Sequence, residues 1–150
     1  MNAKLLDLVS DLPQKHFEVG DDLIMEGKQL GFLAVLKSGS VEVIREGAEI
    51  ARVSSPGAIL GEVSMLLERP HMATVRALES TTIYLMEEPA TFLKEHPEVN
   101  VLISRLLAFR LSLMTNYLAD LKNQFGGNDD HLGMIDEVLA SLAFHQGDGS

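Results

Sequence analysis

The stretch Leu60-Gly-Glu-Val-Ser-Met-Leu-Leu-Glu-Arg-Pro-His-Met-Ala-Thr-Val-Arg-Ala77 is the part of the chain that decides the fold. Gly61 adopts backbone conformations that other residues resist, and it lets a ligand come close to the main chain. We expect a short helix to begin at about Gly61, with free N–H groups in its first turn. A strand is expected to follow over residues 72–77. The stretch therefore predicts a loop, a short helix and a strand.

The sequence on both sides of this stretch is rich in short β-type runs separated by turn residues. Gly20-Asp21-Asp22 and Glu46-Gly47 are two of these turn signals, which recur roughly every 8–12 residues, as in antiparallel sandwiches and barrels. The segment Val41-Glu-Val43 alternates apolar and polar residues, as a half-buried strand does. We predict a mainly β protein with helices, an antiparallel β-roll of the double-stranded jelly-roll type. The expected strands are residues 17–19, 23–25, 32–36, 41–44, 49–53, 72–77 and 81–86.

Helical patterns lie at the two ends of the chain. Residues 4–13 predict a short N-terminal helix that Pro13 stops. Residues 89–96 predict a short helix and residues 98–125 a long C-terminal one, after which residues 126–130 form a break. Residues 131–145 predict an amphipathic helix, and residues 147–150 a flexible tail. We expect residues 1–125 to form one domain and residues 126–150 to form a linker, a helix and the tail.

Four segments, taken in order, resemble the cyclic-nucleotide-binding domain of the catabolite-activator and protein kinase A regulatory type. The stretch 60–77 resembles the phosphate-binding cassette of that family. Residues 17–27 resemble its first hairpin, and residues 35–43 its strand–glycine–strand signature. Residues 92–99 and 106–111 resemble its hinge and long helix. The resemblance covers residues 10–125 or so and implies a stand-alone regulatory module with a β-roll fold.

The resemblance also implies which residues would hold a cyclic nucleotide such as cAMP or cGMP. Glu62 would accept a hydrogen bond from the ribose 2′-hydroxyl. Backbone N–H groups near Ser64 and Ala73 would bind phosphate oxygens, and the Thr74 hydroxyl would add a further hydrogen bond. The complete candidate set is Gly61, Glu62, Val63, Ser64, His71, Met72, Ala73 and Thr74, in which Val63 is expected to pack in the core beneath the cassette.

Position 71 departs from the pattern, because His71 stands where the family has a phosphate-binding arginine. An arginine is always charged and grips two phosphate oxygens, whereas histidine is mostly neutral at pH 7 and shorter. Met72 is a second departure, at a position where the family has alanine or threonine, and its side chain has the size to fill space needed by the ligand. We therefore expect cAMP or cGMP binding to be weak or lost.

Three interpretations of this altered cassette stay open. His71 binds phosphate as a protonated imidazole, so that binding strengthens at acid pH. Alternatively, Arg69 or Arg76 supplies the missing charge, although neighbouring strand residues alternate faces and surface positions are the simpler expectation. In the third interpretation no cyclic nucleotide binds, and the fold is a ligand-free protein-interaction or dimerisation module.

The predicted long helix carries two apolar stripes. One follows a heptad spacing and the other lies beside it, so two surfaces are needed to bury them. The family resemblance implies a homodimer through residues 99–125, with Ser112, Thr115 and Asn116 near the base of the ligand. Back-folding of residues 131–145 is the competing way to cover a stripe. The stripes are Leu107, Leu111, Met114, Leu118, Leu121 and Phe125, and Leu102, Leu106, Phe109, Leu113 and Tyr117.

Composition narrows the function classes further. The chain has 150 residues, no cysteine and a net charge of −10, which disfavours binding to nucleic acid or anionic membranes. The 25 residues after Phe125 contain no lysine or arginine, so no DNA-binding recognition helix is expected there. We also expect no secretory signal, no membrane span, no metal site, no cofactor and no enzymatic activity, since no catalytic or metal-ligand motif appears. A cytoplasmic regulator with an unidentified effector protein is the predicted setting.

Overall fold

The computed structural model of the chain describes residues 2–124 and 129–144, without the side chains of residues 129–132 and 143–144. The chain divides into two compact units, residues 1–100 and 101–150. The first unit contains the β-strands, and the second contains most of the long helix and the last helix. Of the predicted break at residues 126–130, residues 126–128 lie outside the described residues, as does the predicted tail at residues 147–150. Residues 129–130 already belong to the last helix, which begins two residues earlier than predicted.

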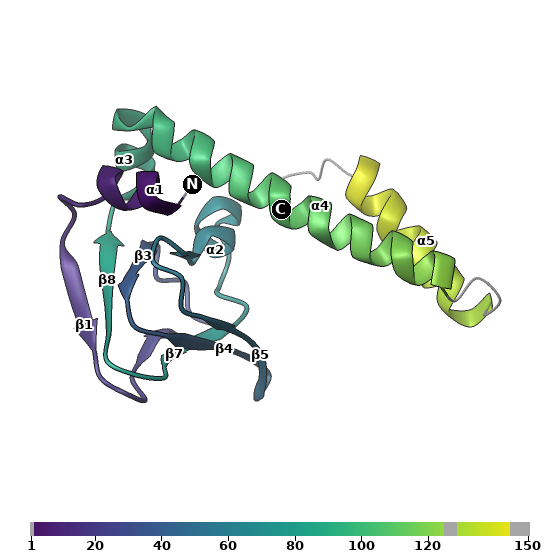
Figure 1. Ribbon diagram of the computed structural model, residues 1–150, viewed down its shortest axis with the longest axis horizontal. Helices are drawn as coiled ribbons and strands as arrows, with labels where there is room; N and C mark the ends of the chain where they lie inside the picture. Colours follow the sequence, from purple (N-terminus) through teal and green to yellow (C-terminus); the bar gives the residue numbers. More distant parts are fainter. Residues whose placement is uncertain (1, 125–128, 145–150) are drawn as a thin grey trace. The chain divides into compact units, whose positions relative to one another are not determined.

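Within the described residues, eight strands form two four-stranded antiparallel sheets, which confirm the predicted β-roll (Figure 1). The strand order is β1-β8-β3-β6 in one sheet and β2-β7-β4-β5 in the other. The two-residue strand β6 was not predicted, because it is too short to show an alternating pattern. The strands are β1 (Gln14–Phe17), β2 (Asp22–Ile24), β3 (Leu33–Ser38), β4 (Val41–Arg45), β5 (Ala48–Val53), β6 (Ile59–Leu60), β7 (Thr74–Ala77) and β8 (Thr81–Met86).

One apolar core holds the two sheets together. Strand β7 illustrates how the sequence builds it, since Val75 and Ala77 are buried while the intervening Arg76 is only half-buried. Strand β5 is exposed along almost its whole length and forms an edge of its sheet. Core residues come from strands of both sheets and include Phe17, Leu23, Ile24, Ala34, Leu36, Val41, Leu60, Val75, Ala77 and Ile83.

Five helices complete the described residues, close to the predicted positions. The N-terminal helix is shorter than predicted and ends at Leu8, because the Ser10 hydroxyl donates to the Asp7 carbonyl and competes with helical bonding. Pro97 was expected to end the preceding helix, and it also starts the long one, where its missing N–H needs no partner. The helices are α1 (Asn2–Leu8), α2 (Glu62–Leu67), α3 (Pro89–Glu95), α4 (Pro97–Gln124) and α5 (Asp129–Phe144).

In the second unit, helix α5 folds back beside the end of α4 (Figure 1). Lys122 on α4 forms an ion pair with Asp136 on α5. Back-folding, one of the two predicted ways to cover the long helix, is therefore present in the structure. It leaves Phe109, Leu113 and Tyr117 of one stripe exposed by 59%, 53% and 60%. In the other stripe, Leu111 and Met114 are exposed by 45% and 52%.

Helix α4 is also long and apolar enough to cross a membrane by length and composition alone. The expectation of no membrane span stays a prediction. Its most apolar window has a mean hydropathy of 1.2, and only 11% of that window is buried. One such helix is weak evidence for a membrane span, because helices of other protein classes pass the same test.

Candidate functional site

The candidate site starts at a sharp turn between β6 and α2. Gly61 has φ 89° and ψ 9°, a left-handed conformation that favours glycine, and it caps the start of α2. The predicted short helix is thus confirmed as Glu62–Leu67. Glu62 lies in its first turn, where a carboxylate interacts favourably with the helix dipole, and it is 6% exposed with an interaction partner of its own.

A local hydrogen-bonded turn closes the segment after α2. The Ser64 hydroxyl donates to the carbonyl oxygen of Arg69, and the Arg69 N–H donates to the Ser64 carbonyl at 3.2 Å. Glu68 between them has φ 52°, the left-handed conformation that ends the helix. The side chain of Ser64 is buried and has a structural partner. Any role of this residue toward a ligand would therefore fall to its backbone N–H.

His71 is buried inside the site and is held there by its backbone. Its N–H donates to the Lys28 carbonyl at 2.9 Å, and its carbonyl accepts from the Gly27 N–H at 2.8 Å. The imidazole ring is tilted against Phe32, with ring centres 6.2 Å apart. These contacts join two segments that are distant in sequence, the β2–β3 loop and the turn that precedes β7.

The ring of His71 faces Gly61, and one of its two nitrogens lacks a polar partner among the described residues. A Cβ atom placed on Gly61 would lie 3.4 Å from His71 Cε1. The neighbouring ring atom Nε2 is buried and has no hydrogen-bond partner within the described part of the chain. Burial lowers the pKa of His71 from its usual value, and so the ring is neutral at pH 7. An unsatisfied buried nitrogen costs about 1–3 kcal/mol, and so Nε2 needs an explanation.

The three residues after His71 differ in their exposure. Met72 is 44% exposed, so its side chain is at the surface. Ala73 and Thr74 are half-buried, as is Val63 on α2. The Thr74 hydroxyl oxygen accepts a hydrogen bond from the Glu26 N–H at 3.1 Å, which leaves its own O–H free to donate.

The two arginines near the cassette occupy different environments. Arg69 is exposed, in agreement with the surface position expected for it. Arg76 is half-buried, and its Nε donates to Asp22 Oδ1 at 2.8 Å. This interaction raises the pKa of Arg76, which is charged at any pH of interest. The charge of Arg76 therefore already has a partner on β2, a pairing that the sequence did not predict.

The predicted base contacts belong to the second unit. Ser112 and Asn116 are exposed on α4, and Thr115 is half-buried. The Thr115 hydroxyl donates to the Leu111 carbonyl one turn earlier on the same helix at 2.9 Å. Their role toward a ligand stays a prediction.

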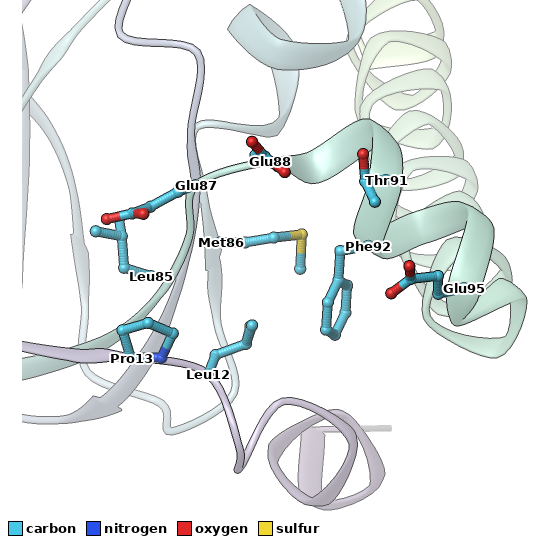
Figure 2. A pocket seen from close by; sticks show the side chains of 9 residues that line it. All are labelled: Leu12, Pro13, Leu85, Met86, Glu87, Glu88, Thr91, Phe92 and Glu95. Carbon is cyan, nitrogen blue, oxygen red and sulfur yellow. The ribbon is translucent and has the colours of Figure 1, made fainter.

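A second concave feature was missed by sequence reasoning. A pocket of about 450 Å³ lies between the turn after α1, the end of β8 and helix α3 (Figure 2). Met86 and Phe92 project into its middle, with Glu88 and Glu95 at its rim. It shares no residue with the cassette, and no cluster suited to a metal ion occurs in the described residues. The lining residues are Leu12, Pro13, Leu85, Met86, Glu87, Glu88, Thr91, Phe92 and Glu95.

Known proteins resemble this chain in sequence and in fold. The family model for the cyclic nucleotide-binding domain matches residues 14–93. The potassium channel AKT1 of rice is 26% identical over 145 residues, which cover 95% of this chain and only 14% of the channel. The chain thus spans a small part of that relative's length.

Two solved structures share the fold at lower identity. The catabolite activator protein of Thermus thermophilus is 21% identical, with a TM-score of 0.65 over 97% of this chain and 87% of the other. The regulatory subunit of a cAMP-independent protein kinase A from Trypanosoma brucei is 22% identical, with a TM-score of 0.57 over 71% of this chain and 39% of the other. The family model covers more than half of the chain, and the structure has the matching β-roll and helices. The chain therefore belongs to the cyclic nucleotide-binding domain family.

Proposed function

We propose that the chain is a regulatory module whose cassette binds a cyclic nucleotide weakly through Gly61, Glu62, Ser64, His71 and Thr74. The observation that carries this proposal is the buried Nε2 of His71, which has no partner among the described residues and belongs to a ring that faces Gly61. A phosphate oxygen is the kind of group that would satisfy it. The role proposed for the chain is binding, without catalysis.

The substitution of the family's arginine by His71 sets the expected affinity. A pair of charge-assisted hydrogen bonds from an arginine to phosphate contributes about 1.5–3 kcal/mol or more. Since ~1.4 kcal/mol is a factor of ten, the nucleotide should bind roughly 10- to 1,000-fold more weakly than to a cassette with arginine. The Trypanosoma brucei relative is described as cAMP-independent, so this fold also occurs in a regulatory subunit that does not depend on cAMP.

Calorimetric titration with cAMP and cGMP tests the proposal. We expect weak binding by the wild type and binding about tenfold tighter or more in His71→Arg, because the guanidinium restores a permanent charge. A second variant, His71→Arg with Met72→Ala, gives the longer side chain more space. His96→Arg, at a half-buried histidine outside the cassette, controls for the added charge. The absence of binding heat from the wild type at millimolar nucleotide contradicts the proposal.

A ligand-free interaction module is the second candidate function. It is favoured by the open stripe of Phe109, Leu113 and Tyr117 on α4, because exposed apolar residues gathered on one face indicate a contact surface. We propose that this face forms a homodimer, whether or not a nucleotide binds. The predicted domain of residues 1–125, the cytoplasmic setting and the effector protein are part of the same proposal.

A further inference from the structure

The surroundings of the His71 ring are closed and largely apolar. The space above Gly61 is bounded by His71 Cε1, the Phe32 carbonyl and Ile24 Cδ1, which lie 3.4–3.5 Å from the position that a Cβ would take. Only 6% of His71 is exposed. Its backbone is fixed on both sides by Gly27 and Lys28, so Nε2 meets a ligand only when the side chain changes its rotamer, which leaves these backbone hydrogen bonds intact.

The charged groups on the elements around the ring have partners or are exposed. On the β2–β3 loop, the Glu26 carboxylate accepts from the Glu46 N–H at 3.1 Å. On β7, Arg76 pairs with Asp22, and on α2, Glu62 has a partner of its own. Arg69 and Lys28 are exposed. No charged neighbour contributes to the lowered pKa of His71, which is caused by burial.

A bound phosphodiester would change the preference of the His71 ring for its neutral form. It is a permanent anion with no proton to give, and its oxygens accept hydrogen bonds. Placed against Nε2, it favours the imidazolium over the neutral ring, because an opposite charge nearby raises a histidine pKa. The neutral ring in the free protein and the charged ring in the complex then differ by one proton, which comes from solvent.

We propose that His71 makes the cassette a proton-linked site, in which a cyclic nucleotide binds together with one proton that is held between Nε2 and a phosphate oxygen. This inference rests on the proposed function and deepens it. The pair of an imidazolium and a phosphodiester carries no net charge. The family's arginine forms the same pair without taking up a proton on binding, because it is already charged. The affinity of the chain for its ligand therefore reports the pH of its surroundings.

Linkage fixes the direction of the pH dependence. Between the pKa of His71 in the free protein and its higher pKa in the complex, the dissociation constant falls by up to about tenfold for each pH unit of acidification. Outside that window the affinity levels off. A binding module with arginine at position 71 shows no such dependence, since arginine stays protonated throughout.

Calorimetry in two buffers with different ionisation enthalpies measures the proton directly. We titrate the full chain with cAMP at about pH 7 in PIPES and in Tris, and the difference in heat gives the number of protons taken up. The wild type should take up as much as one proton, and its dissociation constant should be lower at about pH 6 than at about pH 7 by up to about tenfold. The Cε1 chemical shift of His71 should move from the neutral to the protonated value as nucleotide is added.

Three variants test whether the proton taken up belongs to His71. His71→Arg should bind without proton uptake, and His71→Gln should bind weakly at every pH, because it donates a hydrogen bond without a charge. His16→Gln, at an exposed histidine on β1, should keep the wild-type proton uptake. Nucleotide binding by the wild type without proton uptake overturns the inference and leaves the proposed function standing. No binding at either pH overturns both.

Discussion

At the scale of single residues, Gly39 in the turn between β3 and β4 is the most constrained glycine of the fold. It has φ 99°, and a Cβ atom there would lie 2.4 Å from Thr81 Oγ1 and 2.6 Å from the Ser80 carbonyl oxygen. Real Cβ atoms essentially never come within 3.0 Å of such neighbours, so any substitution must push two turns apart. Gly20 has a similar φ of 87°, yet nothing lies within 4 Å of its Cβ position.

This pair of glycines allows a matched test of stability. Gly20→Ala should lower the free energy of unfolding by about 1–2 kcal/mol through backbone strain alone. Gly39→Ala should lower it by about 3–5 kcal/mol, because overpacking adds to the same strain. Urea unfolding followed by circular dichroism measures both. Equal losses in the two variants would show that the turns separate without strain.

At the same scale, His71 illustrates what the sequence could and could not predict. The departure from arginine is visible in the sequence, and so is the chemistry that follows from it. The backbone bonds to Gly27 and Lys28 are not, because they join segments more than forty residues apart. The unsatisfied Nε2 depends on that long-range packing, as does the Arg76–Asp22 pair. Local pattern thus indicated the candidate site, and tertiary contacts determine its electrostatics.

At the scale of elements, the open face of α4 makes the dimer testable. Leu113→Glu places a charge in the middle of the stripe formed by Phe109, Leu113 and Tyr117. We expect it to convert a dimer into a monomer, because a buried unpaired carboxylate opposes association. Its effect on the folded monomer should be small, since Leu113 is 53% exposed. Sedimentation velocity measures the oligomeric state.

The control for this variant lies on the same helix. Ala108 is exposed and points away from the stripe by helical geometry, about 100° from its neighbour Phe109. Ala108→Glu adds the same charge, and we expect the dimer to persist. A monomeric wild type, or loss of the dimer in both variants, would argue against this face as the contact surface.

The elements themselves were predicted unevenly, for physical reasons. Strand β8 and helix α4 have long, regular patterns, and both lie within a residue of their predicted bounds. Strand β1 was predicted at residues 17–19 and lies at Gln14–Phe17, since its polar residues are exposed and give little pattern. No sequence pattern indicated the pocket beside α3, because its lining comes from two segments that are far apart in the chain, residues 12–13 and 85–95.

At the scale of the whole molecule, the lowered pKa of His71 makes stability depend on pH. In the unfolded chain a histidine takes up a proton as the pH falls through about 6.5, while the folded ring resists it. The unfolded state therefore binds more protons in this range, and folding stability falls as the pH drops from about 7.5 to about 5.5. This is opposite to the predicted effect of acid on nucleotide affinity.

The measurement is urea unfolding without nucleotide at these two pH values. The wild type should lose more stability on acidification than His71→Gln, which has no proton to take up at this position. His16→Gln, at an exposed histidine on β1, is the matched substitution outside the cassette. An identical loss in His71→Gln and in the wild type would assign the pH dependence to other groups.

The backbone bonds that fix residue 71 have a consequence for evolution. They involve only main-chain atoms of Gly27, Lys28 and residue 71 itself, so they survive a change of side chain. Histidine and arginine codons of the CAY and CGY types differ by a single base. A single mutation can therefore convert a cassette whose affinity depends on pH into one whose affinity does not, while these backbone hydrogen bonds stay as they are.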